Sequence, residues 1–548
     1  MSDPSVNIAS HLPAMARHQP HRQAVVFPEG RDASNRVSYT HFTFRQLDDE
    51  SDRIAAGLNG YGITRGVRTV LMVTPSLDFF ALTFALFKIG AVPVLVDPGM
   101  GVKNLGKCLA EAEPEAFIGI PKAHIGRILL RWSRSTIKCL VTVGRRAVWG
   151  GQTLAALRAR VPKNHGFQMA DTQPEETAAI LFTSGSTGVP KGVLYTHGIF
   201  DDQVKKLKAV YGIQPGEVDL PTFPLFALFA PALGMTAIVP DMDFTRPAQV
   251  DPRKIAEAIE DFGVTQMFGS PALINRVGRY GVEHGFKFPS LKRVISAGAP
   301  VPAAVLERFS RLLPKDTQIF TPYGATESLP VASIGSHEIL RETTEQTNRG
   351  AGVCVGKPVE GINLKIIKIT DDPIAEWTDD LELPNGEIGE ITVQGTNVTR
   401  EYFNRESSTK LAKIGDPKND NFYHRMGDVG YMDDQGRVWM CGRKSHRVFT
   451  KEGTLFTIPC EAIFNTHPNV FRTALVCANE QPVLCVELEA DAQNEDQAKL
   501  KNELLEIGSQ HDLTKPIERI LFHPAFPVDI RHNAKIFREK LTLWARRV

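Results

Sequence analysis

Residues 183–191 combine small, hydroxylated and flexible residue types with one lysine, and this combination suits the binding of an oligophosphate. Glycines let backbone N–H groups approach a phosphate without an intervening Cβ, hydroxyl groups add hydrogen-bond donors, and a lysine adds a point charge. The uncharged segment 178–182, which has the composition of a buried strand, leads directly into this loop. The residues that we expect to bind phosphate are Thr183, Ser184, Gly185, Ser186, Thr187, Gly188 and Lys191.

The spacing around Lys191 excludes a P-loop. A P-loop places Gly-Lys-Ser/Thr before a helix, whereas Lys191 follows Pro190 and precedes Gly192, and residues 193–196 have the composition of a second strand. A flexible linker is the simplest alternative, because linkers are also rich in Gly and Ser. A linker is not expected between two apolar strands, so the phosphate-binding loop is the favoured interpretation.

A second group of residues able to bind a nucleotide occurs at 321–328, TPYGATES. Tyr323 offers a flat aromatic face, Gly324 permits a close turn, Thr326 can donate a hydrogen bond to a phosphate, and Glu327 can bind magnesium through oxygen. The same letters occur in ordinary loops, so this segment indicates a nucleotide site only together with the others.

Three charged residues near the C-terminus complete the set. Asp428 stands between glycines, where a carboxylate can accept hydrogen bonds from both ribose hydroxyls, and Arg443 follows it after a short interval. Lys535 precedes residues 537–544, whose apolar side chains recur at helical spacing. Considered alone, Asp428 would be interpreted as a residue of a surface turn, and Lys535 as a solvent-exposed residue at the start of a helix.

In this order along the chain, the segments resemble those of the adenylate-forming superfamily of acyl-CoA synthetases, peptide-synthetase adenylation domains and luciferases. TSGSTGVPKG resembles the phosphate loop of that superfamily, and YGATE follows about 140 residues later, as it does there. The resemblance implies that ATP, with Mg²⁺, is split to AMP and pyrophosphate while a carboxylate becomes an acyl-adenylate. Catalysis would consist largely of positioning and electrostatic stabilisation.

The resemblance also implies roles for individual residues. The catalytic residues would be Lys535, Thr326 and Glu327, with Glu327 also binding Mg²⁺. Besides the loop residues 183–188, the ATP-binding residues would be Lys191, Gly298, Ala299, Tyr323, Gly324, Thr326, Asp428 and Arg443. The acyl pocket would include Phe223, Phe226, Ala227 and Phe229.

The expected acyl pocket lies in residues 223–235, FPLFALFAPALGM, which are apolar and uncharged. Periodicity alone favours a core helix here, and the pocket is what the resemblance implies. Such a lining suits a fatty chain and poorly suits an amino acid, whose ammonium group would need a buried partner. Acyl-CoA synthetases usually carry a histidine near Ala227, so this residue departs from their pattern.

Within the superfamily, residues 96–105, residues 223–235 and the tail VDIRHNAKI resemble most the β-lactone synthetases of bacterial long-chain olefin biosynthesis. The resemblance implies a 2-alkyl-3-hydroxy fatty acid whose own 3-hydroxyl attacks the activated carbonyl, with AMP leaving. His197 and His532 are candidates for the group that takes the hydroxyl proton. A complex with the thiolase, reductase and decarboxylase of the same pathway is also implied.

Two other functions stay open at this point. The first is a long-chain acyl-CoA synthetase or fatty acyl-AMP ligase, which would transfer the acyl group to a thiol. The second is a nucleotide-binding protein that has lost catalysis. The presence of Lys191, Glu327, Asp428 and Lys535 disfavours the second.

The elements that must position these residues are those of an α/β protein. Strand, helix and strand patterns at 70–74, 76–89 and 91–96 predict a βαβ unit and therefore a parallel sheet. We expect a large layered N-terminal domain with βαβ sheets, a β-rich part with hairpins at 385–403, and a small mobile α+β C-terminal domain.

The domain boundary is expected where the resembled superfamily has its hinge. Residues 1–442 would form the N-terminal domain, 443–446 the hinge, and 447–548 the small domain that carries Lys535. The superfamily usually has a hinge Asp or Lys, and this chain has Ser445 and His446. We therefore expect the small domain to rotate with a somewhat different balance of local contacts, or to rotate less.

Composition agrees with a globular enzyme. The 548 residues are 42% hydrophobic and 23% charged, and the net charge of +1 gives no indication of a nucleic-acid or anionic-membrane partner. Seven scattered cysteines without metal-ligand spacing indicate reduced thiols. The chain shows neither a secretory signal nor an apolar run of about 20 residues, so a cytoplasmic location is expected.

Overall fold

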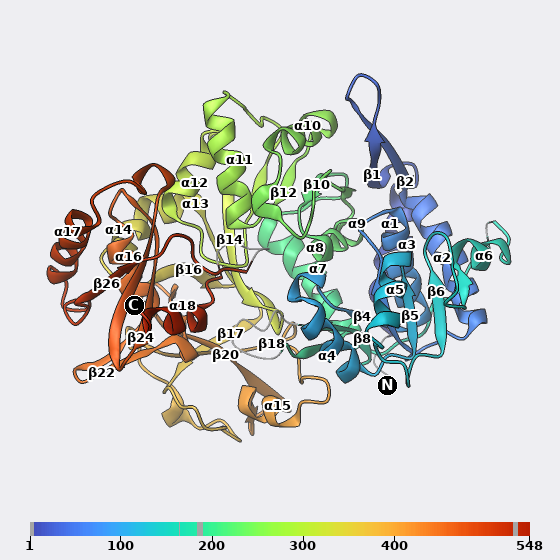
Figure 1. Cartoon of the computed structure of the whole chain (residues 1–548). Helices are drawn as coiled ribbons and strands as arrows, with labels where there is room; N and C mark the ends of the chain where they lie inside the picture. Colours follow the sequence, from blue (N-terminus) through green and yellow to red (C-terminus); the bar gives the residue numbers. More distant parts are fainter. Residues whose placement is uncertain (1–4, 164, 183–189, 530–534) are drawn as a thin grey trace.

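The strands form two large sheets, a small C-terminal sheet and one separate hairpin (Figure 1). This computed structural model describes residues 5–163, 165–182, 190–529 and 535–548, and the statements on strands and helices refer to these residues. The mixed α/β class and the small C-terminal α+β part predicted from the sequence are confirmed.

The first sheet is mainly parallel, with the strand order β7-β6-β5-β3-β4-β8-β9 and one antiparallel pair, β8 with β9. The expected βαβ unit is confirmed, because helix α3 (Leu77–Ile89) connects the parallel neighbours β3 and β4. The first strand lies two residues earlier than expected. The strands are β3 (Arg68–Met72), β4 (Val92–Leu95), β5 (Ala116–Gly119), β6 (Cys139–Thr142), β7 (Gln152–Thr153), β8 (Thr177–Phe182) and β9 (Gly192–Thr196).

Local signals define the ends of α3. The Ser76 side chain accepts a hydrogen bond from the Phe79 N–H at the first turn, and Gly90, in the left-handed conformation with φ of +75°, ends the helix. Residues 79–89 are all buried, so α3 is a core helix that packs on both sides. This burial explains why its sequence is apolar on every face.

The larger sheet changes from parallel to antiparallel at β14. Strands β1, β11, β10, β12, β13 and β14 run parallel in this spatial order, and the strands beyond β14 pair antiparallel. The strands are β1 (Gln23–Arg31), β2 (Val37–Thr43), β10 (Val218–Pro221), β11 (Thr236–Ile238), β12 (Gln266–Phe268), β13 (Arg293–Ile295), β14 (Gln318–Ala325), β15 (Ser328–Gly335), β16 (Val353–Pro358), β17 (Ile362–Ile367), β18 (Gly389–Gly395), β19 (Lys413–Asp416), β20 (Asn421–Met432) and β21 (Val438–Arg443). Open α/β sheets bind ligands outside the carboxyl ends of their strands, and the loops after β10, β12 and β13 all lie at that edge.

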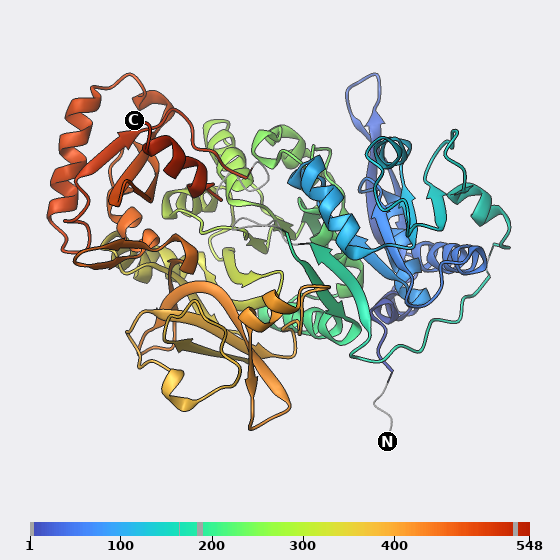
Figure 2. The ribbon, with the colours of Figure 1, turned by 60° about the horizontal axis from the view of Figure 1, so that its bottom comes forward.

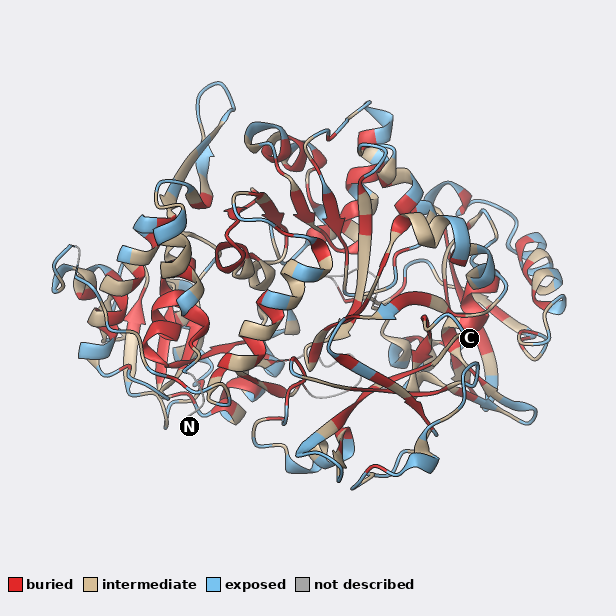
Figure 3. Cartoon of the chain, turned by 180° about the vertical axis from the view of Figure 1, so that it is seen from behind, coloured by how far each residue is buried: buried red, intermediate tan, exposed pale blue. Residues whose placement is uncertain are grey.

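Helices cover these sheets and bury their faces, as the colouring of Figure 3 shows. Helices α10 to α12 share one core with the parallel half of the larger sheet. The helices are α1 (His11–His18), α2 (Phe44–Tyr61), α4 (Val102–Ala112), α5 (Pro121–Leu129), α6 (Leu154–Ala159), α7 (His197–Tyr211), α8 (Pro224–Ala227), α9 (Phe229–Leu233), α10 (Pro252–Phe262), α11 (Pro271–Glu283), α12 (Ala303–Ser310), α13 (Ser336–Glu338), α14 (Thr344–Asn348), α15 (Glu406–Ala412), α16 (Thr457–Phe464), α17 (Gln497–Ser509) and α18 (Arg538–Ala545).

The C-terminal part has hydrophobic cores of its own. It contains the hairpin β22 (Val448–Thr450) with β23 (Gly453–Leu455) and the sheet β24 (Val470–Ala478), β25 (Gln481–Leu488) and β26 (Arg519–Phe522). Alternate residues of β24 enter different cores: Leu475 packs with Phe464, and Ala474 packs with Leu541. The sheet is therefore covered on both faces. Figures 1 and 2 both show this part, coloured orange to red, beside α11 and α12.

Two local expectations are wrong. Residues 385–403 contain a single strand, β18, which pairs with the distant β17 and β20 and does not form a local hairpin. Residues 223–235 form two short helices, α8 and α9, instead of one. Within the described residues no helix is long and apolar enough to cross a membrane, and all seven cysteines are free.

Candidate active site

A cleft of about 1960 Å³ lies where the larger sheet, its antiparallel strands and the C-terminal part meet. Its lining includes every described residue that the sequence analysis assigned to catalysis or ATP: Lys191, Gly298, Ala299, Tyr323, Gly324, Thr326, Glu327, Asp428, Arg443 and Lys535. These residues span more than 300 positions of the chain, so only the fold brings them together. The loop residues Thr183, Ser184, Gly185, Ser186, Thr187 and Gly188, and the candidate base His532, lie outside the described residues.

The connection between β14 and β15 carries Thr326 and Glu327. Ala325 pairs with Ser328 across the antiparallel strands, so only these two residues form the turn. A Cβ on Gly324 would lie 2.6 Å from the Ser328 carbonyl oxygen, which leaves room for glycine alone. The Tyr195 hydroxyl donates a hydrogen bond of 2.5 Å to the Thr326 carbonyl oxygen. The turn is therefore anchored to β9, the strand that follows the predicted phosphate-binding loop in the sequence.

Glu327 receives a hydrogen bond that the sequence did not reveal. The Tyr402 hydroxyl donates to Glu327 Oε1 over 2.7 Å, and the Lys191 ammonium lies 4.6 Å from the centre of the Tyr402 ring. Burial, and then the negative charge of Glu327, raise the pKa of Tyr402 far above its usual range. Tyr402 therefore stays a donor and orients the carboxylate.

Two lysine side chains interact electrostatically with this carboxylate. Burial lowers the pKa of Lys191, and Glu327 opposes that change. Burial lowers the pKa of Lys413 to about 7, again opposed by Glu327, and its ammonium group donates to the Thr399 carbonyl oxygen. Opposite charges in a partly dry site attract more strongly than in water, so this corner of the cleft favours an anionic ligand.

Tyr323, Asp428 and Arg443 form the second polar group of the cleft. The Tyr323 hydroxyl donates to Asp428 Oδ2 over 2.7 Å, and Arg443 Nη1 lies 3.1 Å from Asp428 Oδ1. Asp428 and Arg443 face each other across β20 and β21, which explains their approach. Burial raises the pKa of Asp428, and the positive charges of Arg443 and, more weakly, Lys535 oppose the rise.

Asp428 retains an acceptor for a ligand. Its Oδ1 is buried and has no hydrogen-bond partner among the described residues, although the arginine charge lies near. A buried acceptor without a donor costs about 1–3 kcal/mol, and a ribose hydroxyl would supply the donor. Gly298, which follows β13 with φ of +101°, and Ala299 line the same cleft. The residues present therefore fit a nucleotide.

Lys535 reaches the cleft from the C-terminal part. Its backbone carbonyl oxygen accepts a hydrogen bond from the Asp529 N–H over 2.9 Å, which ties the segment before α18 to the end of the preceding loop. The electrostatic effect of Lys535 on Asp428 is consistent with its place in the cleft lining. Both parts of the chain thus contribute cations to one site.

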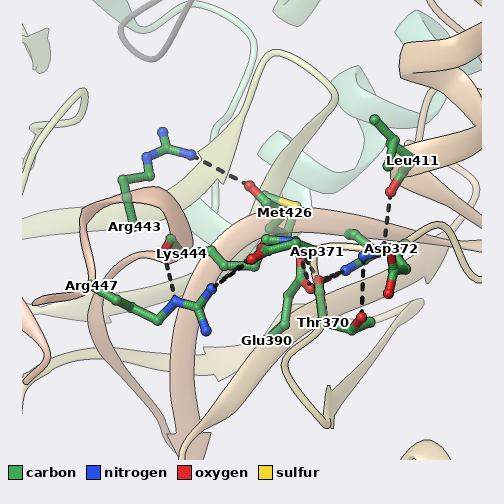
Figure 4. Close-up of polar contacts among 10 residues, drawn as sticks. Thr370, Asp371, Asp372, Glu390, Leu411, Met426, Arg443, Lys444 and Arg447 are labelled. Atoms are coloured by element: carbon green, nitrogen blue, oxygen red, sulfur yellow. Dashed lines mark hydrogen bonds and ion pairs between the residues drawn. The ribbon is translucent and has the colours of Figure 1, made fainter. Parts of the chain in front are cut away.

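The segment between the two parts is held by charged contacts (Figure 4). The Lys444 ammonium donates to the Thr370 carbonyl oxygen over 2.8 Å and lies 3.2 Å from Glu390 Oε2. Arg447 forms an ion pair with Asp371 at 3.3 Å. Arg425 Nη2 lies 2.6 Å from the same oxygen of Glu390, and both of these side chains are buried. These contacts hold the connection against the antiparallel strands.

Ser445 and His446, in the place of the usual hinge residues, both line the cleft. Burial and the positive charges of Arg538 and Arg443 lower the pKa of His446 to about 3. The imidazole is therefore neutral at neutral pH, unlike an aspartate or lysine at this place.

The residues expected to form the acyl pocket are not among those lining the cleft. Phe226 packs against Phe268 with ring centres 4.5 Å apart, Phe229 packs against Phe200 at 6.1 Å, and Ala227 is buried. Phe223 lies beside Phe226, with ring centres 5.3 Å apart. Phe223, Phe226 and Phe229 therefore each pack against another aromatic ring, and their role in an acyl pocket stays a prediction.

The structure argues against His197 as the base. The residue is fully buried, its Nδ1 accepts a hydrogen bond of 3.2 Å from the Ile8 N–H, and it is not among the residues that line the cleft. Burial lowers its pKa to about 4. His197 has the character of a core histidine.

A magnesium ion fits one carboxylate of the cleft. Within the described ranges no group of three or more His, Cys, Asp or Glu side chains could hold a metal by itself. Magnesium commonly binds through one or two carboxylates together with substrate phosphates, and Glu327 offers such a hard oxygen ligand. The donor set therefore suits an ion that arrives with the nucleotide.

The chain is similar to known proteins over nearly its whole length. The family model described as AMP-binding enzyme matches residues 12–403. The chain is 53% identical to the olefin beta-lactone synthetase of Stenotrophomonas maltophilia, with 98% of each chain covered, and 52% identical to that of Xanthomonas campestris, with 98% of this chain and 97% of the relative covered. The solved amide bond synthetase McbA from Marinactinospora thermotolerans has the same fold, with a TM-score of 0.80 at 20% identity and coverage of 98% and 99%.

Proposed function

Because this chain belongs to the family of AMP-binding enzymes, and within it to the olefin β-lactone synthetases, we propose that it activates a long-chain 2-alkyl-3-hydroxy fatty acid with ATP and closes it to a β-lactone. The chain is an AMP-forming ligase that uses ATP. The observation that carries the finer proposal is the convergence of Lys191, Glu327, Asp428 and Lys535 on one cleft.

We assign the nucleoside to the Tyr323–Asp428–Arg443 group. Asp428 Oδ1 lies 3.1 Å from Arg443 Nη1 but accepts no hydrogen bond from the described residues, so it would accept one from a ribose hydroxyl. The segment of Gly298 and Ala299 would lie beside the base. The phosphates would then extend toward Lys191 and the loop 183–188, whose composition suits them. Glu327, oriented by Tyr402, would hold the magnesium ion, which would neutralise phosphate charge when bound.

Adenylation requires a carboxylate to approach a negatively charged phosphorus. Its transition state gathers charge on the phosphoryl oxygens, so positioned cations lower the barrier. At 4 Å and an effective dielectric near 20, a cation attracts a unit negative charge by roughly 4 kcal/mol. Lys535 would supply that attraction between the acid and the α-phosphate, and Lys191 would stabilise the leaving pyrophosphate.

Ring closure then proceeds within one molecule. The 3-hydroxyl oxygen forms a bond to the acyl carbon, the bond from that carbon to the phosphate oxygen breaks, AMP leaves with the electron pair, and the hydroxyl proton is released. Tethering removes the entropy cost of bringing in a second reactant, although ring strain offsets part of the gain. The apolar residues Phe223, Phe226, Ala227 and Phe229 would bind the chain of the substrate.

We further propose residues 1–442 as the N-terminal domain and 447–548 as a small mobile domain, joined by a hinge at 443–446. The separate hydrophobic cores of the C-terminal part support this division. The charged contacts of Lys444 and Arg447 would set the resting position of the small domain.

Product analysis tests the proposal. The enzyme is incubated with ATP, magnesium and a 2-alkyl-3-hydroxy fatty acid in the absence of CoA, and the organic product is identified by NMR. We expect a four-membered lactone together with AMP and pyrophosphate. Persistence of the acyl-adenylate, or turnover only after CoA is added, would refute β-lactone formation and favour an acyl-CoA ligase.

A further inference from the structure

Exposed aliphatic side chains gather on one region of the N-terminal part. Of eleven large hydrophobic side chains exposed in the described residues, six lie within residues 102–148. They are Val102, Ile125, Ile128, Leu129, Leu130 and Val148, and Leu129 and Val148 are 75% and 98% exposed. Single exposed aliphatic residues need no explanation, but such a concentration indicates an interaction surface.

These residues belong to neighbouring elements that pack against one another, and we define the α4–α5 face as the exposed side chains of residues 102–148. A Cβ on Gly106 of α4 would lie 3.2 Å from Trp132, and one on Gly126 of α5 would lie 3.4 Å from the same indole. Both helices, labelled in Figure 1, therefore pack against one side chain. Trp149 stacks on His124 of α5, with ring centres 5.3 Å apart, and brings in the loop that carries Val148.

The α4–α5 face is also strongly basic. Residues 102–148 contain nine Lys and Arg against three Asp and Glu, a net charge of +6, whereas the remaining chain has 54 against 59, a net charge of −5. Two of the acidic residues are paired, Glu111 with Arg405 and Glu115 with Arg68 and Lys138. The whole-chain charge of +1 conceals this asymmetry, which is why composition alone gave no indication of an anionic partner.

We propose that the α4–α5 face docks reversibly on an anionic lipid surface. Aliphatic side chains on helices that lie along the membrane can enter the boundary between headgroups and acyl chains, while lysines and arginines around them are attracted by anionic lipids. A nucleic acid would match the charge but would leave the aliphatic side chains without apolar contacts. No described helix can span a bilayer, so the contact is confined to the surface.

The face is connected to the cleft through α4. Arg405 donates to Glu111 Oε2 over 2.7 Å, and the Asn404 side chain donates to the Glu111 carbonyl oxygen over 3.1 Å. Tyr402, three positions before Arg405, orients Glu327. An enzyme docked on the membrane would meet its long-chain acid there, because such an acid partitions into the lipid. This consequence rests on the proposed function, whereas docking itself does not.

Vesicle flotation tests the proposal without any catalytic step. The full-length protein is mixed with vesicles of phosphatidylcholine alone or of phosphatidylcholine with phosphatidylglycerol, and the floated fraction is measured at low and high salt. We expect binding to the anionic vesicles only, and weaker binding at high salt. The triple variant I125Q/I128Q/L129Q and the quadruple variant K103Q/K107Q/K122Q/R134Q should each reduce the partition coefficient by about tenfold or more.

Matched controls change the same residue types elsewhere. V282Q/L543Q replaces two exposed aliphatic residues of α11 and α18, and K315Q/K357Q/K451Q/K501Q removes four exposed positive charges outside the face. Both should float like the wild type, and circular dichroism should show that every variant is folded. The proposal is overturned by a wild type that floats with neither kind of vesicle, or by controls that lose binding equally. It is also overturned if light scattering shows that the two face variants dissociate an oligomer, since the face would then bind a second copy.

Discussion

At the scale of single residues, Lys535 is the cation of the C-terminal part that we assign to adenylation, and it lines the cleft together with Arg472 and Arg538. K535A should reduce the rate of pyrophosphate release by about 100-fold or more, since a positioned charge in the transition state is lost. ATP affinity, measured by calorimetry, should change little. K540A is the matched control, because Lys540 lies exposed on the same segment and contacts only the Phe537 ring in the described contacts. Near-normal pyrophosphate release by K535A would remove Lys535 from its proposed role.

Tyr402 acts through Glu327 and is therefore a positioning residue. Y402F removes the 2.7 Å hydrogen bond to the carboxylate. The magnesium concentration for half-maximal activity should rise by about tenfold, as happens when partners of metal ligands are lost. Y211F is the control, because the hydroxyl of Tyr211 contacts Ser333 and does not line the cleft. An unchanged magnesium dependence in Y402F would show that the bond is only structural.

Lys413 makes the stability of the folded protein depend on pH in a defined direction. Its pKa is lowered to about 7, so between about pH 7 and 10.4 the unfolded chain binds one proton more than the folded chain does at this residue. The contribution of Lys413 to the free energy of unfolding therefore rises with pH in this window, by up to about 1.4 kcal/mol per pH unit.

Urea unfolding of the wild type and K413M across this window measures the effect. The free energy of unfolding of the wild type, minus that of K413M, should increase as the pH rises. A difference that stays constant from pH 7 to 10 would contradict the lowered pKa of Lys413.

At the scale of secondary-structure elements, the connection between the two parts depends on Glu390 of β18. Its carboxylate is buried and receives Arg425 and Lys444. E390Q leaves the Arg425 charge buried without its partner, so the free energy of unfolding should fall by about 3–5 kcal/mol. E345Q is the comparison, because Glu345 pairs with Arg349 on the surface and its loss should cost less than about 1 kcal/mol. Equal losses in the two variants would show that the buried pair has no special role.

Some of the secondary-structure elements could be predicted from the sequence, and others could not. The βαβ unit of β3, α3 and β4 was predictable, because its caps and apolar runs are local signals. The antiparallel partners of β18 were not, because residues 385–403 contain strand composition but no information on distant pairing. Residues 223–235 form two helices because Pro231 has no N–H to donate to the Ala227 carbonyl oxygen, and Gly234 ends the second helix. Both signals are present in the sequence.

The residues of the cleft also differ in whether they could be predicted from the sequence. Resemblance identified Tyr323, Asp428 and Arg443, and the fold brings them together. It did not identify Tyr402, whose partner Glu327 lies 75 positions away, or Lys413, whose burial has no local signature. Contacts of this kind depend on which strands become neighbours, so they appear only with the fold.

At the scale of the whole molecule, the proposed function requires two parts of the chain to meet at one ligand. Arg279 of α11 forms an ion pair with Glu489 beyond β25 at 3.0 Å, so the C-terminal part also contacts the N-terminal helices away from residues 443–446. The position of Lys535 in the cleft therefore depends on contacts at both sides of the C-terminal part. A nucleotide that binds both parts would stabilise this arrangement.

A crystal structure of the protein with a non-hydrolysable ATP analogue tests this central claim most directly. The account predicts that the ribose hydroxyls bind Asp428, the base lies beside Tyr323, and the Lys535 ammonium is directed toward the α-phosphate. An analogue bound away from Asp428, or bound there with Lys535 outside contact distance of every phosphate, would contradict it.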